Sequence, residues 1–108
     1  VLRRAAPEVA AKLEAGDLSL DLIGRKAYRA GEELRLSHKE FDLLAALIKN
    51  TGTALSRDRL LQDVWGYDFP GDTRTVDVHI RWLREKIEAD AAEPKHIVTV
   101  RGVGYRFE

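Results

Sequence analysis

Residues 73–88 read TRTVDVHIRWLREKIE, and residues 97–107 read IVTVRGVGYRF. At about 100° per residue, the first stretch forms one narrow apolar stripe, as in a helix that lies on a core: Val76, Ile80, Leu83 and Ile87. The second stretch has β-branched and aromatic residues on both sides of Arg-Gly-Val-Gly, which is typical of a hairpin. We expect an amphipathic helix followed by a two-stranded β-hairpin.

The side of this helix opposite the apolar stripe is the candidate reading face. It carries Arg74, Val78, Arg81, Trp82 and Glu85. One flank carries Asp77 and Arg84, and the other carries Thr75, His79 and Lys86. A basic helix face followed at once by a hairpin with an Arg-Gly tip suits a body that enters one DNA groove and touches the next. We therefore expect DNA binding, with Glu85 beyond the groove because a carboxylate repels phosphate.

The bulk composition limits how such binding could work. The chain has 108 residues, enough for one domain, and its 18 basic and 18 acidic residues give a net charge of zero. Neutrality argues against a protein that coats nucleic acid indiscriminately, because that binding depends on phosphate neutralisation. The positive charge must therefore be concentrated on one face.

Several features of the composition bear on where the protein is located in the cell and on whether the chain is part of a longer protein. The chain contains no cysteine, which argues against disulfides and zinc fingers, and no apolar run approaches a membrane span. We expect a cytoplasmic protein without a membrane association. The chain begins at Val1 and contains no methionine, so we expect it to be part of a longer protein.

The remaining pattern predicts a sheet and two further helices. Residues 18–22 alternate apolar and polar side chains, and glycines at 24 and 31 indicate turns of a small antiparallel sheet. Residues 37–40 form a capping box for a helix that ends near residues 50–52. Ser56 is expected to cap a second helix, which ends at Gly66. Residues 1–16 are rich in alanine and charge, and we interpret them as a linker, with a frayed helix as the alternative.

Several short motifs resemble those of a known protein family. They are RTVDVHI (74–80), TVRGVGYRF (99–107), KEFDLL (39–44), SRDRLL (56–61) and VWG (64–66). Together and in this order they resemble the OmpR/PhoB-type effector domain of bacterial two-component response regulators, from about Leu18 to the C-terminus. The resemblance implies an α+β winged helix-turn-helix over residues 17–108: a four-stranded antiparallel sheet, three helices and a C-terminal hairpin, the wing. Residues 1–16 resemble the linker that follows the receiver domain.

The resemblance also implies a mechanism and partners. The helix over 73–88 would enter the major groove of double-stranded DNA, and the wing over 97–107 would reach the minor groove. Two copies usually bind a direct repeat head to tail. A sensor kinase would act through a receiver domain that this chain does not contain, and no cofactor is expected. The loop that contacts RNA polymerase in this family corresponds here to Gly66, Tyr67, Asp68, Phe69, Pro70, Gly71 and Asp72.

Arg81 and Arg84 are the main candidates for DNA contact from the helix. The alternative is a solvated face with Asp77–Arg81 and Glu88–Arg84 pairs, each worth a few tenths of a kcal/mol. The motifs around them favour DNA contact, more so for Arg81, because it points more directly outward. By resemblance, Arg74 suits a phosphate contact and Thr75 could add a hydroxyl.

Trp82 departs from relatives that place an arginine at this position to reach a base edge. Tryptophan cannot make a bidentate contact with guanine, although its ring could meet a thymine methyl group or a sugar. It could equally pack on Tyr67 or Phe69. Val78 could also meet a thymine methyl group, or it could be an ordinary exposed valine. The target sequence therefore does not follow from relatives.

The other candidate contacts rest mainly on the resemblance. His79 matches a phosphate-contacting position, with a structural role as the alternative. Arg57 and Trp65 match backbone contacts, although Trp65 could be mostly core. In the wing, Arg101 suits the negative potential of the minor groove. Thr99 and Tyr105 are possible phosphate contacts, and Tyr105 could instead be a core aromatic.

Two other classes of function deserve comparison. An enzyme needs a nucleophile, base or metal set in a pocket, and here the serines are explained as helix caps and the carboxylates are scattered. The histidines share no metal-ligand spacing, so no metal site is expected. A winged helix that docks proteins would fit the neutral charge. That alternative predicts no salt-dependent DNA binding and no effect of losing Arg81.

Overall fold

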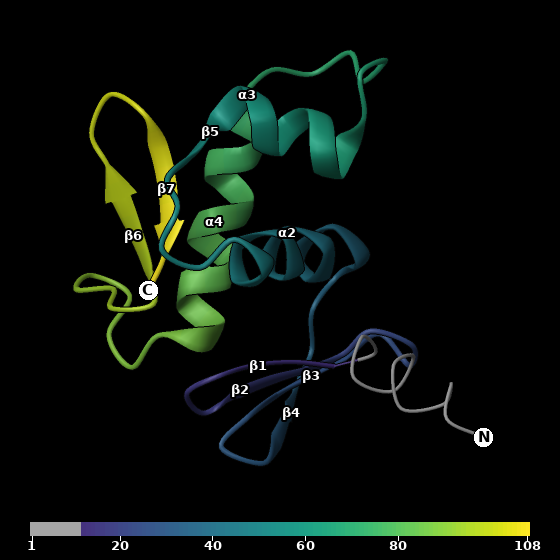
Figure 1. The fold of residues 1–108 in the computed structure, drawn as a ribbon, viewed down its shortest axis with the longest axis vertical. Helices are drawn as coiled ribbons and strands as arrows, with labels where there is room; N and C mark the ends of the chain where they lie inside the picture. The colour runs from purple at the N-terminus through teal and green to yellow at the C-terminus, as the bar shows by residue number, and fades with distance from the viewer. Residues whose placement is uncertain (1–11) are drawn as a thin grey trace.

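The computed structural model describes residues 12–108, which form two sheets around three helical segments (Figure 1). The N-terminal sheet is antiparallel in the order β1-β2-β3-β4. Its strands are β1 (Lys12–Ala15), β2 (Leu18–Asp21), β3 (Lys26–Arg29) and β4 (Glu32–Leu34). The alternation of residues 18–21 gives the sheet one face that packs on the core, because Leu18 and Leu20 are buried while Ser19 and Asp21 are only partly buried.

The first strand corrects the expected boundary of the domain. Residues 1–16 were interpreted as a linker, but Lys12–Ala15 pair along their whole length with β2, from Lys12 opposite Asp21 to Ala15 opposite Leu18. The strand alternates exposed and partly buried residues, but it is only four residues long and none of them is fully buried, so composition alone suggested a linker. Residues 1–11 lie outside the described part of the chain.

The helices begin where the sequence indicates. Ser37 caps α2 (His38–Lys49), and both hydrogen bonds of the capping box with Glu40 are present. Ser56 caps α3 (Arg57–Leu60), which continues as a π-helical turn over Leu61–Trp65 and ends at Gly66. The third helix, α4 (Arg74–Ile87), is preceded by Asp72, whose carboxylate accepts a 2.9 Å hydrogen bond from the Arg74 amide.

The wing contains one strand more than expected. The hairpin of β6 (Ile97–Val100) and β7 (Gly104–Phe107) is joined by the short β5 (Leu55–Ser56), in the order β5-β7-β6. Gly104 lies opposite Ser56, and a Cβ at Gly104 would approach the Leu55 carbonyl oxygen to 2.1 Å. Only glycine therefore allows β5 and β7 to approach this closely.

The core lies where α2, α4 and both sheets meet. The apolar stripe of α4 is fully buried, as the helical wheel predicts: Val76, Ile80, Leu83 and Ile87. An ion pair between the half-buried Lys86 and the buried Glu40 also ties α4 to the start of α2, because Nζ of Lys86 lies 2.7 Å from Oε1 of Glu40. With its inner stripe fixed in this way, α4 presents its opposite face to solvent. No helix in residues 12–108 is long and apolar enough to cross a bilayer.

Candidate nucleic-acid interface

The outward face of α4 matches the predicted wheel. Arg74, Val78, Arg81, Trp82 and Glu85 are all exposed. The Arg81 side chain is the most open candidate base reader, with 81% of its surface exposed. The two expected flanks, with Asp77 and Arg84 on one and Thr75, His79 and Lys86 on the other, are half-buried. The face predicted from the sequence therefore exists as a continuous surface.

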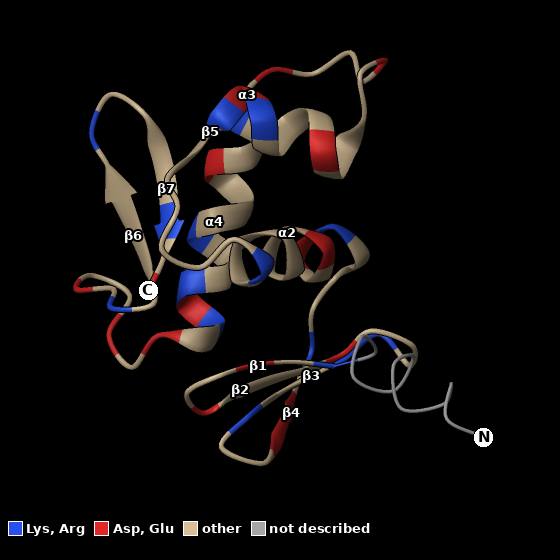
Figure 2. Ribbon diagram, in the orientation of Figure 1, with Lys and Arg blue, Asp and Glu red and all other residues tan. Residues whose placement is uncertain are grey.

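The two arginines of this face differ in how firmly they are paired, because Arg81 has only a loose acidic partner whereas Arg74 is hydrogen-bonded to Asp72. Nε of Arg81 lies 3.8 Å from a carboxylate oxygen of Glu85, and Arg74 lies 3.0 Å from Asp72. The Asp77–Arg81 pair of the solvated-face alternative is not formed, because Asp77 binds Arg57 and Tyr105. Exposed pairs at i,i+4 spacing such as Arg81–Glu85 contribute only about 0.3–0.5 kcal/mol. The Arg81 guanidinium can therefore exchange its partner for phosphate or base oxygens, whereas Arg74, although exposed, would first have to give up its hydrogen bonds to Asp72. Figure 2 shows further basic residues at the start of α3 and on the wing turn.

Asp77 joins three elements of the interface. Its Oδ2 lies 2.7 Å from Nη1 of Arg57 at the start of α3, and its Oδ1 accepts a 2.6 Å hydrogen bond from the Tyr105 hydroxyl in β7. Burial of the phenol, followed by its hydrogen bond to Asp77, raises the pKa of Tyr105 to about 12. Tyr105 is thus the core aromatic of the two alternatives, and its hydroxyl positions the wing against α4.

Arg84 serves the wing rather than the outward face. Its guanidinium donates 3.1 and 2.9 Å hydrogen bonds to the Ile97 carbonyl and a 2.8 Å hydrogen bond to the Thr99 hydroxyl. It also lies 5.5 Å from the centre of the Tyr105 ring. The Glu88–Arg84 pair of the solvated-face alternative is not formed, because Arg84 binds the Ile97 carbonyl and Thr99 whereas Glu88 binds the amides of residues 95–97.

Glu88 is a buried structural carboxylate that sequence reasoning missed. Its two oxygens accept hydrogen bonds of 2.9–3.2 Å from the amides of Lys95, His96 and Ile97. These bonds fix the start of β6 directly against the end of α4. A glutamate at the end of an amphipathic helix looks like an ordinary exposed residue, so the sequence pattern contained no signal for this role.

Four aromatic rings run from the loop before α4 onto its outward face. Trp65 lies 6.2 Å from Phe69 and 4.9 Å from His79, and His79 lies 4.9 Å from Trp82. Nδ1 of His79 is 2.8 Å from the Thr75 carbonyl oxygen, which fixes the imidazole on the helix. Trp82 therefore packs on His79, not on Tyr67 or Phe69 as the packing alternative supposed. Trp65 is half-buried.

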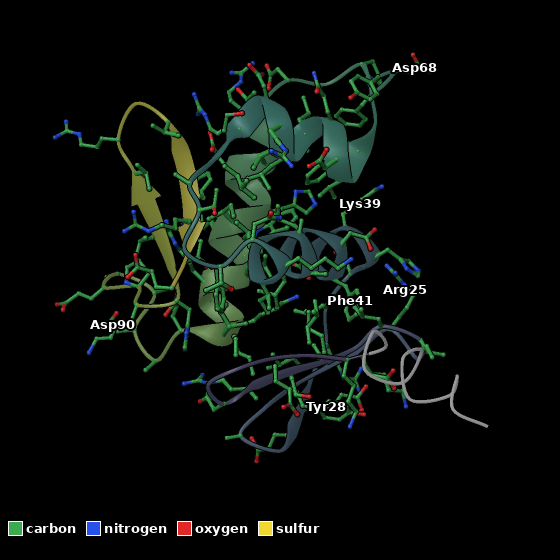
Figure 3. The ribbon with its side chains drawn as sticks, in the orientation of Figure 1. Arg25, Tyr28, Lys39, Phe41, Asp68 and Asp90 are labelled. Atoms are coloured by element: carbon green, nitrogen blue, oxygen red, sulfur yellow. The ribbon has the colours of Figure 1, made fainter. Side chains whose placement is uncertain are left out.

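The loop over residues 66–72 projects from the end of α3, with Asp68 at its far tip in Figure 3. Tyr67 is 82% exposed, whereas Phe69 is half-buried beside Trp65. A Cβ at Gly71 would come within 2.3 Å of the Phe69 ring, so this glycine allows the loop to fold over that ring. Asp72 closes the loop and caps α4. The hydrogen bonds from Arg74 lower the pKa of Asp72.

The wing turn completes the interface. Arg101 is exposed at its tip, and Gly102 adopts φ 77°, which favours glycine. Among residues 12–108, Arg101 forms no ion pair. A groove between the wing and the start of α3 is lined by Arg57, Thr99, Arg101 and Tyr105 together with the turn residues. A backbone phosphate could lie here beside two guanidinium groups.

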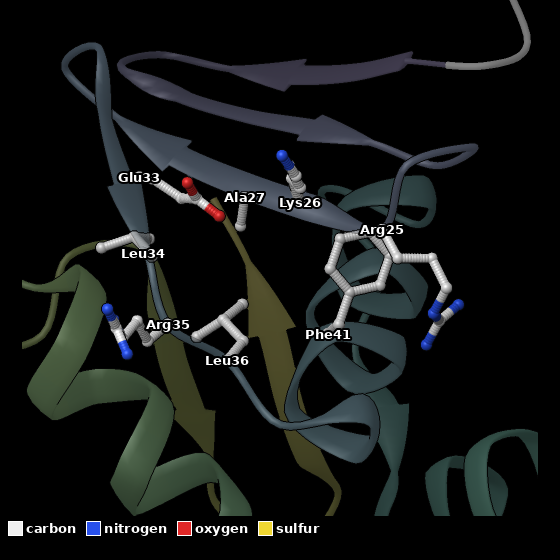
Figure 4. Close-up of a pocket in the computed structure, with 8 residues that line it drawn as sticks. All are labelled: Arg25, Lys26, Ala27, Glu33, Leu34, Arg35, Leu36 and Phe41. Atoms are coloured by element: carbon white, nitrogen blue, oxygen red, sulfur yellow. The ribbon is translucent and has the colours of Figure 1, made fainter.

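A second pocket lies away from this surface, between the N-terminal sheet and α2 (Figure 4). Its walls include Arg25, Lys26 and Arg35 as well as Glu33, so its charge is mixed. Arg25 is already paired with Asp42 at 2.8 Å and lies over the Phe41 ring. In the described residues no three histidine or carboxylate side chains gather as they would around a metal ion.

With this geometry established, comparison with known proteins identifies the family. Residues 31–107 match the family model described as "Transcriptional regulatory protein, C terminal". The chain belongs to this family. The resemblance to the OmpR/PhoB-type effector domain is thereby confirmed, and the family is one of transcriptional regulators, not of enzymes.

Named relatives agree with the assignment. The sensory transduction protein RegX3 of Mycobacterium leprae is 50% identical over 96 residues, 89% of this chain and 48% of the relative. The DNA-binding response regulator MtrA of Mycolicibacterium smegmatis is 47% identical over 105 residues, 97% of this chain and 46% of the relative. The chain thus spans about half the length of these curated relatives.

Solved structures support the winged-helix fold. The response regulator DrrB of Thermotoga maritima, an OmpR/PhoB homologue, is 34% identical with a TM-score of 0.84, covering 98% of this chain and 50% of that one. The DNA-binding domain of RstA from Klebsiella pneumoniae, solved in complex with the RstA box, is 38% identical with a TM-score of 0.80. That match covers 89% of this chain and 95% of the RstA domain.

Proposed function

We propose that this domain binds double-stranded DNA sequence-specifically and regulates transcription as the output domain of a phosphorylation-controlled response regulator. The observation that carries the proposal is the outward face of α4, where exposed Arg74 and Arg81 lie beside a wing with an exposed Arg101. This face belongs to a chain whose fold matches a domain solved on its own DNA element. A helix of this kind fits the major groove of B-DNA.

Each part of the interface then has its own task. Arg81, with Val78 and Trp82, would face base edges, and Arg74, Thr75 and His79 would meet the phosphate backbone. Because Nδ1 of His79 is bound to the Thr75 carbonyl oxygen, a phosphate contact would use Nε2 in its protonated form. Arg57, Trp65 and Thr99 would meet the backbone beside the groove, and Arg101 would enter the minor groove.

The geometry favours a positioning role over direct DNA contact for two of the candidate residues. The Arg84 guanidinium is hydrogen-bonded to the wing, and the Tyr105 hydroxyl is hydrogen-bonded to Asp77. We propose that they support DNA binding by positioning the wing. The distinction matters because a positioning residue affects all DNA sequences alike, whereas a base reader affects one base pair.

The proposal extends to partners. The exposed loop over residues 66–72 would contact RNA polymerase, with Tyr67 as its most open apolar group. Two copies would bind a direct repeat head to tail in the cytoplasm, and a cognate sensor kinase would act through a separate receiver domain. Isolated copies would bind each half-site weakly, and pairing would supply the remaining affinity through effective concentration. No cofactor is required.

The test is to select bound duplexes from a random DNA pool with the purified domain and to repeat the selection with Arg81→Ala. We expect a short motif repeated at about one helical turn. If Arg81 reads a base, the variant should lose about 1–3 kcal/mol of binding free energy and relax one position of the motif. If Arg81 meets only phosphate, the loss should be uniform across sequences, and the salt dependence should become shallower by about one.

Absence of an enriched motif, with weak or no binding at low salt, would contradict the proposal and favour a winged helix that docks proteins. An unchanged motif and affinity in Arg81→Ala would contradict the proposed reading face.

A further inference from the structure

Two large apolar side chains lie exposed next to each other on the outward face of α4. Val78 is 42% exposed and Trp82 is 44% exposed. Their i,i+4 spacing places them one above the other on the helix surface. The other large apolar side chains exposed in residues 12–108 lie on turns or loops: Ile23, Tyr67 and Val103. An apolar pair at the centre of a helix face that is otherwise charged needs an explanation.

The tryptophan of this pair is held in place. One side of its indole meets the His79 ring at 4.9 Å with an interplanar angle of 62°. His79 is held in turn by the Trp65 ring at 4.9 Å and by its bond to the Thr75 carbonyl oxygen. The indole is thus supported from one side and open on the other. A rigid apolar surface loses little conformational entropy when a partner covers it.

The chemistry of the pair determines which bases it can favour. Valine has no hydrogen-bonding group, and indole has a single donor, so neither can form the bidentate contacts that read guanine or adenine. The apolar feature of the major groove is the 5-methyl group of thymine. Covering a methyl group with these side chains is favourable, whereas covering the edge of a G·C pair would leave its polar atoms without partners.

We propose that Val78 and Trp82 make this domain select thymine methyl groups at the base pairs beneath the second and third turns of α4. This inference rests on the proposed function, because it requires α4 to lie in the major groove. It adds a chemical basis for specificity that operates beside the hydrogen bonds of Arg81. The pair therefore sets a preference that Arg81 alone could not.

The test uses the duplex obtained by selection. Each thymine is replaced singly by deoxyuridine, which removes the 5-methyl group and keeps every hydrogen-bonding atom. We expect one or two replacements to weaken binding about three- to fivefold, as burial of one methyl group predicts. Val78→Ala and Trp82→Ala should each remove the sensitivity at one of these positions. Ile23→Ala, an exposed apolar truncation on the β2–β3 turn, should leave both sensitivities unchanged.

The outcomes separate this inference from the proposed function. Sequence-specific binding that no deoxyuridine weakens would overturn the inference and leave the proposed function intact. A sensitivity that persists in both Val78→Ala and Trp82→Ala would also overturn it, because the methyl groups would then be read elsewhere. Failure of the wild-type domain to bind any duplex would contradict the proposed function itself. Equal denaturation midpoints for all variants would show that truncation of these exposed groups has not altered folding.

Discussion

The Tyr105 hydroxyl donates a 2.6 Å hydrogen bond to Oδ1 of Asp77, which joins the wing to the recognition helix. The other oxygen of the same carboxylate binds Arg57 at the start of α3. Together with Arg84 and Glu88, which bind β6, this aspartate sets the position of the wing relative to α4. The DNA-facing geometry depends on this link, although Tyr105 itself is buried.

Tyr105→Phe tests the link directly. The folded state raises the pKa of Tyr105 to about 12. The stabilisation contributed by the protonated Tyr105 hydroxyl is therefore fully present below pH 10.0, the ordinary value, and is lost as the pH rises toward 12. Ultraviolet titration of the wild type should show one of the three tyrosines ionising late. The late step should be absent in Tyr105→Phe, and its free energy of unfolding near neutral pH should fall by about 1.5 kcal/mol. A late step that survives the substitution would contradict the assignment.

Arg84→Ala and Arg84→Lys distinguish a wing anchor from a phosphate contact. The alanine variant loses three hydrogen bonds to β6, and we expect the free energy of unfolding to fall by about 1.5–3 kcal/mol. DNA affinity should fall similarly for selected and shuffled duplexes. Lysine keeps the charge but not the planar fork, so it should restore little. Full recovery of affinity in Arg84→Lys would show that charge, and not wing geometry, is the contribution of this residue.

Lys86→Met should expose the role of the ion pair between Lys86 and the buried Glu40. Burial alone would raise the pKa of Glu40, but its hydrogen bonds to Lys86 and Ser37 outweigh that effect and lower the pKa. The pair therefore stabilises the wild type above pH 4.5, the ordinary value, and this stabilisation is lost as the pH falls below it. Lys86→Met should lose roughly 1–3 kcal/mol at pH 7, because it leaves a buried carboxylate without its cation.

The pH dependence of Lys86→Met provides the sharper comparison. Without the cation, only the Ser37 hydrogen bonds oppose the effect of burial, so the pKa of Glu40 should be less depressed and the variant should lose less stability on acidification than the wild type. Denaturant titrations from pH 7 to pH 3 would measure this difference. Lys26→Met, which removes an exposed lysine from β3, should stay within about 0.5 kcal/mol of the wild type at each pH. Equal acid dependence in both variants would argue against the pair.

Glu88→Gln should loosen the root of the wing. Glutamine keeps only one acceptor oxygen, so part of the set of amides from Lys95 to Ile97 loses its partner, at about 1–3 kcal/mol. Hydrogen exchange at the Ile97 amide should accelerate. The same substitution at the exposed Glu85, one turn earlier, is the control and should change stability by less than about 0.5 kcal/mol. Equal effects at both positions would contradict the capping role of Glu88.

Patterns with a strong physical cause were predictable from the sequence. The buried stripe and exposed face of α4 follow from helical periodicity, and the caps at Ser37 and Ser56 follow from local hydrogen bonding. The hairpin follows from its glycines and β-branched residues. These features depend on neighbours within a few residues, so the sequence contains the information.

Features that depend on distant partners were not predictable. Two-residue β5 is a strand only because Gly104 allows β7 to approach it, and the alternation of β1 covers only four residues, none of them fully buried. The solvated-face alternative paired Asp77 with Arg81 one turn away, but Asp77 binds Arg57 and Tyr105 across the fold. Trp82 was undecided because helical spacing places His79 beside it, but no local rule indicates that Trp65 packs on the other side of His79.

The most direct measurement locates α4 and the wing on bound DNA. Because the chain has no cysteine, Glu85→Cys on α4 and Val103→Cys on the wing turn can each carry a DNA-cleaving reagent, with Ile23→Cys as the control. On the selected duplex, we predict cleavage bordering the major groove of the motif from position 85. From position 103, we predict cleavage in the adjacent minor groove, about half a helical turn away. Equal cleavage from position 23, or none from position 85 on bound DNA, would contradict the account.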